Sequence, residues 1–415
     1  MNLLKTYALV MSVLSLAISL NSLAEEEIGC KVSVRDDRTF LVNGEPFFPI
    51  GAYRCGDIVA DETGKLLGIL RDMGFNTVFY HGYPSETARK DLDRIANAGL
   101  RAWYRNGQVY PNTDVLKNFA EAFKTHPALL FWEVDDEPIV NKQTYDNWVG
   151  SVEIMKKLDP DHPVYIVDFP YLDKQDELAR WAKLADVYAF DHYPIPLKNL
   201  GSWIDEMPPD WPRSIAVMGK VTQLWQKLAP GKPVIAVCQA FSHGNEPDGF
   251  PTYQQSRFMA YDVIINGANG IFYYPGPTAE IVERLGAQEI PQERDNFWFW
   301  SYHKQVVKEL AEMAPVFAAR DADWKPKVTI IGDTLTKPEQ IEYRVKQNGK
   351  YPVILTANTS DYPATVQIKA PELRLRKIHC WYEDHRLRAS WGGAFSDRLE
   401  PYAVKIYSTK PRPQQ

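Results

Sequence analysis

Three acidic residues stand in a row inside the run F-W-E-V-D-D-E-P-I at positions 131–139. Like charges this close repel each other, so folding alone does not account for them. Repulsion from the two aspartates would raise the pKa of Glu137, and a carboxyl group with a raised pKa can donate a proton at neutral pH. The run therefore indicates general acid/base chemistry. The competing interpretation is that the three acids form salt bridges with Arg54 or Arg105.

The run belongs to a series of eight short apolar segments that must position it. The segments cover residues 47–54, 75–82, 100–107, 128–138, 163–170, 185–194, 232–241 and 270–276. Stretches with helical spacing separate them, and strands that alternate with helices pair in parallel. Eight such units predict an α/β fold, a closed (β/α)8 TIM barrel. An open doubly wound sheet is the alternative, but no G-x-G-x-x-G turn follows the first strand.

The pattern changes after an expected final helix near 295–313. Residues from about 321 to 410 alternate with period two around Asn-Gly and Pro turns, which is typical of a small antiparallel β-sandwich. We therefore expect a barrel with an N-terminal hairpin over residues 25–320 and a β-sandwich domain over residues 321–415. No low-complexity linker joins the two domains, so we expect them to pack rigidly.

The first 24 residues have the pattern of a secretory signal peptide. One lysine, Lys5, precedes an apolar run, and the small-residue site S-L-A predicts cleavage after Ala24. Ser and Asn interrupt the apolar run, which favours a cleaved signal over a stable membrane span. We therefore expect a secreted or periplasmic protein.

Composition excludes some functions. The 415-residue chain has a net charge of −6 and no basic run, which argues against nucleic-acid binding. The four cysteines, Cys30, Cys55, Cys238 and Cys380, allow three disulfide pairings, and none has the C-x-x-C spacing of a structural zinc site. The sequence does not predict the oligomeric state.

Polar residues gather at one end of the expected strands. Active sites of such barrels lie at the carboxyl ends of the strands, and those ends supply a mostly polar set: Arg54, His81, Arg105, Asp135, Asp136, Glu137, Asp168, Asp191, His192, Tyr193, Gln239 and Tyr274. The opposite ends begin with apolar residues, Gly or Pro. His81 and His192 lack the close spacing of metal ligands, so we expect neither a metal nor a cofactor.

The run W-E-V-D-D-E-P resembles the fourth-strand motif W-E-x-x-N-E-P of clan A glycoside hydrolases. Further matches are FLVNGEPFFPIGAY with the opening hairpin and first strand, GFNTVFY with the second strand, DHYP with the sixth-strand H-x-Y end, and KPVIAV with the seventh strand. The C-terminal sandwich resembles an accessory domain of many members. The resemblance covers nearly the whole mature chain. It implies that Glu137 is the general acid/base and that Asp136 holds the 2-substituent of a sugar.

The chain departs from the family pattern at three positions. Asp136 replaces the asparagine of the motif, and the strand-two arginine falls on Phe79. The strand-seven glutamate, which is the nucleophile, falls on Cys238, with Gln239 next to it. A retaining double displacement through a carboxylate at that position is therefore impossible.

Two mechanisms then stay open for an exported glycoside hydrolase that cleaves O-glycosidic bonds in oligo- or polysaccharides. In the first, a 2-acetamido group of the substrate attacks, and Asp136 orients it. In the second, the enzyme inverts, with Asp191 or alternatively Asp168 activating a water molecule. Glu246 could act as a displaced nucleophile, although a solvated loop position is the favoured interpretation. The alternative function is non-hydrolytic carbohydrate binding on a degenerate barrel.

The other polar residues at the strand ends are expected to bind the carbohydrate substrate. They are Arg54, His81, Arg105, Asp168, His192, Tyr193, Gln239 and Tyr274. The two arginines would either pair with the aspartates of the run or face the carboxylate or sulfate of an acidic sugar. Trp203 and Trp211 would either stack on sugar rings or cover the rim of the barrel.

Overall fold

The computed structural model describes residues 29–105, 112–142, 144–201, 203–243, 249–291, 295–383 and 385–412. The expected signal peptide and Glu246 lie outside these residues. Within the described part of the chain, no helix is long and apolar enough to cross a membrane. The four cysteines are all buried, and each has a free thiol.

Eight parallel strands close into a barrel. They are β4 (Ile50–Ala52), β5 (Thr77–His81), β6 (Arg101–Arg105), β7 (Leu129–Asp136), β8 (Val164–Asp168), β9 (Val187–Asp191), β10 (Val234–Gln239) and β11 (Gly270–Tyr274). Strand β11 pairs with β10 on one side and with β4 on the other, which closes the sheet. The predicted (β/α)8 barrel is confirmed, and the open sheet is excluded.

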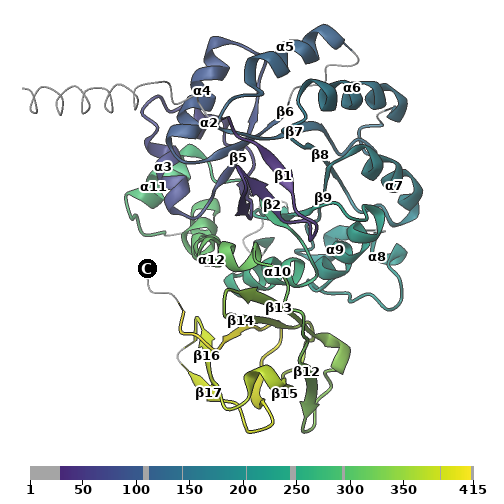
Figure 1. Cartoon of the computed structure of the whole chain (residues 1–415), viewed down its shortest axis with the longest axis vertical. Helices are drawn as coiled ribbons and strands as arrows, with labels where there is room; N and C mark the ends of the chain where they lie inside the picture. Colours follow the sequence, from purple (N-terminus) through teal and green to yellow (C-terminus); the bar gives the residue numbers. More distant parts are fainter. Residues whose placement is uncertain are drawn as a thin grey trace, which may run out of the picture.

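Helices surround the barrel on its outer face (Figure 1). They are α2 (Gly56–Val59), α3 (Lys65–Asp72), α4 (Glu86–Asn97), α5 (Thr113–Phe123), α6 (Tyr145–Leu158), α7 (Gln175–Leu184), α8 (Trp203–Glu206), α9 (Val217–Leu228), α10 (Tyr253–Ile265), α11 (Ala279–Gly286) and α12 (Asn296–Phe317). Their buried apolar faces form one continuous core with the outward-facing strand residues. This layer holds the strands, and therefore their carboxyl ends, in fixed positions.

The amino-terminal end of the barrel is closed by a hairpin. Strands β1 (Val32–Val34), β2 (Phe40–Val42) and β3 (Glu45–Phe47) form a three-stranded antiparallel sheet. The Phe40 ring lies 5.1 Å from the ring of Phe131, which points into the barrel. Since apolar side chains fill this end, a substrate can approach the barrel interior only from the carboxyl ends of the strands.

The C-terminal part of the chain is a β-sandwich. One sheet contains β12 (Lys327–Ile331), β15 (Ala364–Lys369) and β18 (Ala394–Leu399). The other contains β13 (Ile341–Asn348), β14 (Tyr351–Asn358), β19 (Val404–Ser408), β16 (Lys377–Trp381) and β17 (Arg386–Arg388). All pairings are antiparallel, and apolar side chains from both sheets pack between them. The predicted sandwich is confirmed.

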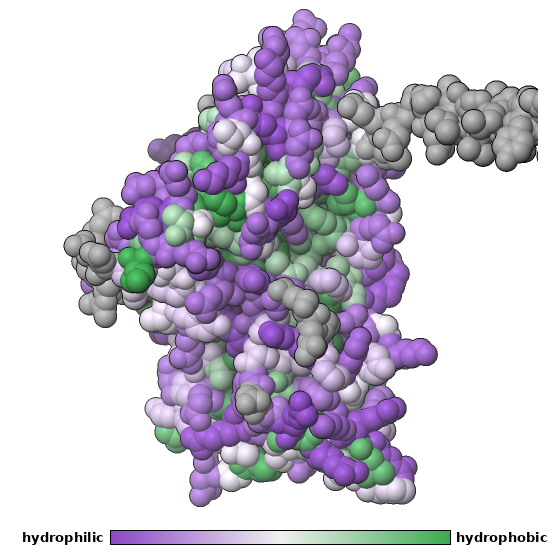
Figure 2. Space-filling model, turned by 90° about the vertical axis from the view of Figure 1, so that its left-hand side faces the viewer, coloured by the Kyte–Doolittle hydropathy of each residue, from purple (hydrophilic) through white to green (hydrophobic). Residues whose placement is uncertain are grey.

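The sandwich packs against helices α10 and α12 (Figure 1). Arg257 of α10 donates to both carboxylate oxygens of Glu309 in α12 at 3.0 Å and to the Val404 carbonyl of β19 at 2.9 Å. One largely buried guanidinium therefore ties two barrel helices to the sandwich. Figure 2 shows the two parts as one continuous body with a mostly hydrophilic surface.

Helix α10 begins with a capping box. It is buried on several sides and has no single apolar face. Nine of its residues are buried. The Thr252 hydroxyl accepts from the Gln255 amide at 3.2 Å, and the Gln255 side chain accepts from the Thr252 amide at 2.8 Å. We expect Thr252→Ala to lower the free energy of unfolding by about 0.5–2 kcal/mol in urea denaturation. Thr113→Ala, at an exposed helix start, is the control; equal effects of both changes would contradict the capping role.

Candidate active site

A pocket of about 260 Å³ opens at the carboxyl ends of the barrel strands. It is lined by Tyr53, Asp136, Glu137, Val167, Asp191, Tyr193, Val237 and Tyr274. Five of these residues belong to the polar set taken from the sequence. The structure therefore brings together the carboxylates of strands β7 and β9 and two tyrosines that follow β9 and end β11.

A β-bulge in strand β7 decides which acids face the pocket. Glu133 lies opposite Tyr165 and Asp136 lies opposite Val167, and both partners point into the barrel. Regular alternation would place Glu133 and Asp135 on the same face. The register shift between these two residues inserts one extra position, so Asp136 faces inward and Asp135 faces the helices.

Glu137 is held in a left-handed backbone conformation just after β7. Its φ is 48°, a region that costs a residue with a β-carbon about 1–2 kcal/mol. Its amide donates to the Val167 carbonyl at 2.9 Å, and its carbonyl accepts from the Asn141 amide at 3.0 Å. Backbone strain of this kind persists where the surroundings fix it, and here it places the half-buried Glu137 carboxyl in the pocket.

The carboxyl groups of Glu137 and Asp191 line the same pocket and influence each other's pKa. Burial, followed by the charge of Asp136, raises the pKa of Glu137. Burial, followed by the charges of Glu137 and Asp136, raises the pKa of Asp191 well above its usual range. The interaction with Asp191 lowers the pKa of Glu137 and so opposes the effects of burial and of Asp136 on that group.

Arg105 lies between two carboxylates beside this pair. Its side chain is 3.1 Å from Asp136 Oδ2 and donates from Nε to Glu133 Oε1 at 3.1 Å. The guanidinium lies 4.9 Å over the ring of Phe79, the position that the family resemblance gives to an arginine. The salt-bridge interpretation of the acidic run thus holds for Asp136. Glu137 has no ion pair with any described residue, so its proton stays available.

Sequence reasoning missed Glu133 and Tyr53. Glu133 is completely buried, and its Oε2 has no partner among the described residues; burial raises its pKa to about 7 against the opposing effect of Arg105. The sequence feature that could have identified Glu133 is the glutamate at the second position of the W-E-V-D-D-E-P motif. Tyr53 lines the pocket and its hydroxyl lies 3.1 Å from that of Tyr165. Its position just after the first strand was the signal.

Asp168 and His192 lie behind the pocket wall. Asp168 is fully buried and accepts a hydrogen bond from the Tyr188 hydroxyl at 3.0 Å. His192 is fully buried with its ring 4.4 Å from that of Trp203, and burial lowers its pKa to about 3, so it is neutral. Neither residue lines the pocket, so this geometry does not support the substrate-binding roles expected for them.

Strand β10 offers no nucleophile to the pocket. Gln239 accepts from the Ile195 amide at 2.9 Å and donates to the carbonyls of Ile195 and Phe241. Its amide group is thus used to hold two loops, and a substrate contact has no support here. Cys238 is buried on the helix-facing side of the strand, and burial raises the pKa of its thiol far above neutral pH.

Arg54 and His81 are exposed at the rim, outside the pocket lining. The Arg54 guanidinium lies 4.8 Å over the ring of Tyr274, which does line the pocket.

The two tryptophans after strand β9 pack against the protein. Trp203 is buried and donates to the Pro170 carbonyl at 2.7 Å, and Trp211 packs half-buried against the core. Of the two alternatives for the tryptophans, covering the barrel fits this placement.

A trio of possible metal ligands, Cys380, His385 and Asp397, lies in the sandwich. The Lys405 ammonium is 3.0 Å from Asp397 and 3.1 Å from Glu383. The lysine therefore already supplies the positive charge that a metal ion would bring to these carboxylates.

Asp135 gives a pH-dependent prediction. Burial raises its pKa to about 7, and its Oδ2 has no partner among the described residues. The pKa of Asp135 in the folded state exceeds its unfolded value of about 3.9. The contribution of this carboxyl group to the free energy of unfolding therefore falls as the pH rises from about 4 to about 7. We expect Asp135→Asn to raise the free energy of unfolding by on the order of 1 kcal/mol at pH 8 and by little at pH 4. Urea denaturation at both pH values measures the difference; an equal effect at both would contradict it.

Sequence comparison finds a local match to known enzymes. No family model matches the chain. Human β-glucuronidase is 27% identical over 161 residues, which cover 34% of this chain and 24% of that enzyme. The chain therefore spans about a quarter of the length of the curated relatives it matches.

Two solved structures share the fold. A provisionally assigned glycoside hydrolase from Bacteroides vulgatus has a TM-score of 0.54 and 12% identity, covering 93% of this chain and 83% of its own. An Anoxybacillus α-amylase has a TM-score of 0.52 and 10% identity, covering 89% and 99%. The resemblance to glycoside hydrolases taken from the sequence is confirmed for the fold.

Proposed function

We propose that the chain is a glycoside hydrolase in which Glu137 protonates the leaving oxygen. The observation that carries this proposal is the pocket at the carboxyl ends of the strands, whose lining brings together Glu137, Asp136 and Asp191. A glycosidic oxygen leaves poorly unless it is protonated, and a carboxyl group that keeps its proton at neutral pH can supply it. The shared barrel fold and the local similarity to β-glucuronidase support the same reaction class.

The pocket suits a sugar ring at the end of a chain. Its volume of about 260 Å³ is small, and Tyr53, Tyr193 and Tyr274 supply aromatic surface beside the carboxylates. Tyr193 and Tyr274 stack on each other with ring centres 5.8 Å apart. We infer that the substrate is an oligo- or polysaccharide cleaved near its end.

The mechanism we infer is assistance by an acetamido group of the substrate, because strand β10 presents Val237 and no carboxylate to the pocket. Burial and the charge of Asp136 raise the pKa of Glu137, so these two effects keep Glu137 protonated. Asp136, paired with Arg105, is the carboxylate that would orient the amide of the substrate and stabilise the positive charge that develops.

Non-hydrolytic carbohydrate binding is the second candidate, because strand β10 presents Val237 to the pocket and no carboxylate. A panel of nitrophenyl glycosides, including neutral, acetamido and acidic sugars, separates the two functions. We expect the purified chain to release nitrophenol from at least one acetamido sugar. Sugar binding without release from any member would favour the binding protein.

We also propose that the protein is exported. The proposal rests on residues 1–24 of the sequence. Amino-terminal sequencing of the protein from its native host tests it, and a mature chain that begins at Glu25 is the expected result.

A further inference from the structure

A second pocket, of about 250 Å³, lies where the barrel meets the sandwich. Its walls come from the turn between β1 and β2, the carboxyl ends of α9 and α10, the segment after α12, and strand β13. The hairpin turn and the helix ends place it at the amino-terminal end of the barrel, away from the acidic pocket. Its volume is close to that of the candidate active site.

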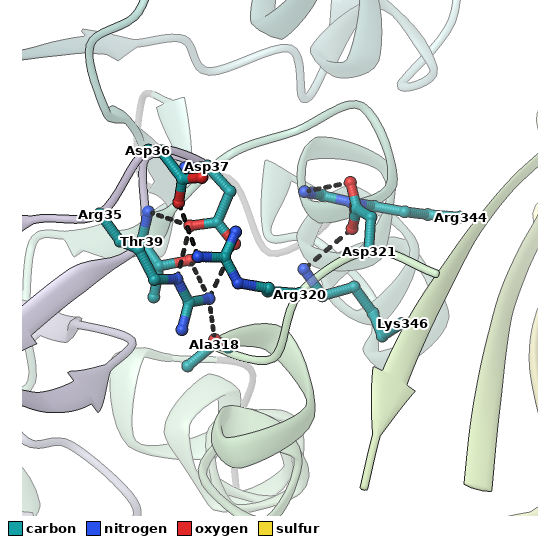
Figure 3. Close-up of polar contacts among 9 residues, drawn as sticks. All are labelled: Arg35, Asp36, Asp37, Thr39, Ala318, Arg320, Asp321, Arg344 and Lys346. Carbon is teal, nitrogen blue, oxygen red and sulfur yellow. Dashed lines mark hydrogen bonds and ion pairs between the residues drawn. The ribbon is translucent and has the colours of Figure 1, made fainter. Parts of the chain in front are cut away.

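Carboxylates on the hairpin side of this pocket are already paired (Figure 3). Asp37 accepts two hydrogen bonds from Arg35, at 2.8 and 2.7 Å. Asp36 forms an ion pair with Arg320 at 2.8 Å. Arg35 also donates to the Ala318 carbonyl at 2.9 Å, which fixes the turn against the end of α12.

Asp321, on the sandwich side, lies between two cations of β13 (Figure 3). Arg344 is 2.9 Å from its Oδ1 and Lys346 is 3.0 Å from the same oxygen. Lys346 is 3% exposed. Burial, followed by the charge of Arg344, lowers the pKa of Lys346 to about 8 against the opposing effect of Asp321. Two cations therefore neutralise Asp321; Arg344 and Asp321 line the pocket, and Lys346 lies outside the lining.

Arg38 and Lys325 add two further cations to the pocket lining. Neither side chain has a hydrogen-bond or ion-pair partner among the described residues. Arg38 is half-buried, and its backbone φ is 71°, a region that glycine adopts without strain and arginine does not. A glycine would suit this turn better, so the turn itself does not account for an arginine here. The unpaired guanidinium lines the pocket.

The remaining wall is aromatic and amidic. Trp324 and Tyr343 are half-buried in the lining, together with Gln226 and Asn266. Cations select a negatively charged oxygen group, and an arginine can bind a carboxylate or sulfate through two parallel hydrogen bonds. Aromatic surface suits the ring of a sugar. The side-chain amides of Gln226 and Asn266 already donate to the Asn266 carbonyl and to Asp262, respectively, and so hold this wall in place.

We propose that this pocket is a binding site for an acidic sugar unit, held by its carboxylate or sulfate group. Arg38 and Lys325 bind the anionic group, and Trp324 contacts the ring. The site lies at the opposite end of the barrel from the acidic pocket, so it does not depend on hydrolysis there. It would hold a second part of an acidic polysaccharide on the same protein.

Isothermal titration of the full chain tests the site with three probes at constant ionic strength: sodium glucuronate, glucose and sodium sulfate. We expect glucuronate to bind at least about tenfold more tightly than glucose, as a hydrogen-bonded charge pair requires. Sulfate that displaces glucuronate would show that the anionic group alone is recognised. Glucuronate and glucose binding with equal affinity would overturn the proposal.

Arg38→Gly locates the binding. We expect affinity for glucuronate to fall about tenfold or more, while the thermal midpoint stays the same or rises, because glycine relieves the left-handed backbone. Lys325→Gln, an exposed change that leaves the fold intact, should weaken binding severalfold. Arg388→Gln removes an exposed charge from β17 and should change nothing. Unchanged affinity in both Arg38→Gly and Lys325→Gln, or a lowered thermal midpoint of Arg38→Gly with unchanged binding, would overturn the proposal.

Discussion

Glu137→Gln is expected to lower the turnover of an alkyl glycoside by about 10²–10⁴-fold, because the amide occupies the same volume but cannot protonate the leaving oxygen. The left-handed backbone at Glu137 is held by main-chain hydrogen bonds to Val167 and Asn141, which the change leaves in place. The thermal midpoint should therefore stay close to that of the parent. Initial rates with matched protein concentrations measure the effect.

The control for this change is Glu283→Gln. Glu283 is exposed on helix α11, so the same loss of charge far from the pocket should leave turnover unaltered. A Glu137→Gln variant within a factor of about two of the parent would remove Glu137 from the reaction.

Asp191→Asn is expected to move the alkaline limb of the pH dependence of kcat/KM to higher pH, with little loss of turnover below that limb. Burial and the charge of Asp136 raise the pKa of Glu137, whereas the interaction with Asp191 lowers it. An amide is a weaker donor than a carboxylic acid, so the variant lowers the pKa of Glu137 less and the general acid keeps its proton to a higher pH.

A different role for Asp191 predicts a different profile. If Asp191 were the base of an inverting enzyme, Asp191→Asn would abolish hydrolysis at every pH, because the water molecule would have no activating group. Tyr193→Phe is a useful companion, since the interaction with Tyr193 lowers the pKa of Asp191, and its loss should shift the limb without abolishing activity. Equal loss at all pH values in Asp191→Asn would contradict the proposed effect of Asp191 on the pKa of Glu137.

The barrel could be predicted from the sequence because its strands are buried apolar segments that alternate with segments of helical spacing. The sandwich followed equally well from its period-two alternation. Glu137 and Asp136 could also be identified from the sequence, since a specific motif contains them. These features depend on local patterns, and the described structure confirms the fold that they imply.

The orientation of polar residues at strand ends could not be predicted in the same way. The bulge in β7 exchanges the faces of Asp135 and Asp136, and no local pattern announces an extra residue in a strand. Asp168 and Asp191 both end strands, yet the first points to the helices and the second lines the pocket. Gln239 ends a strand next to the pocket but bonds to backbone groups of neighbouring loops. Such outcomes depend on tertiary contacts.

The most direct test of proton donation by Glu137 is the dependence of the Glu137→Gln defect on the leaving group. The rates of parent and variant would be compared on a methyl glycoside and a dinitrophenyl glycoside of the same sugar. Dinitrophenolate departs without protonation, so the proposed role predicts a large loss on the methyl glycoside and a nearly normal rate on the dinitrophenyl glycoside. An equally large loss on both substrates would contradict the assignment of Glu137 as the general acid.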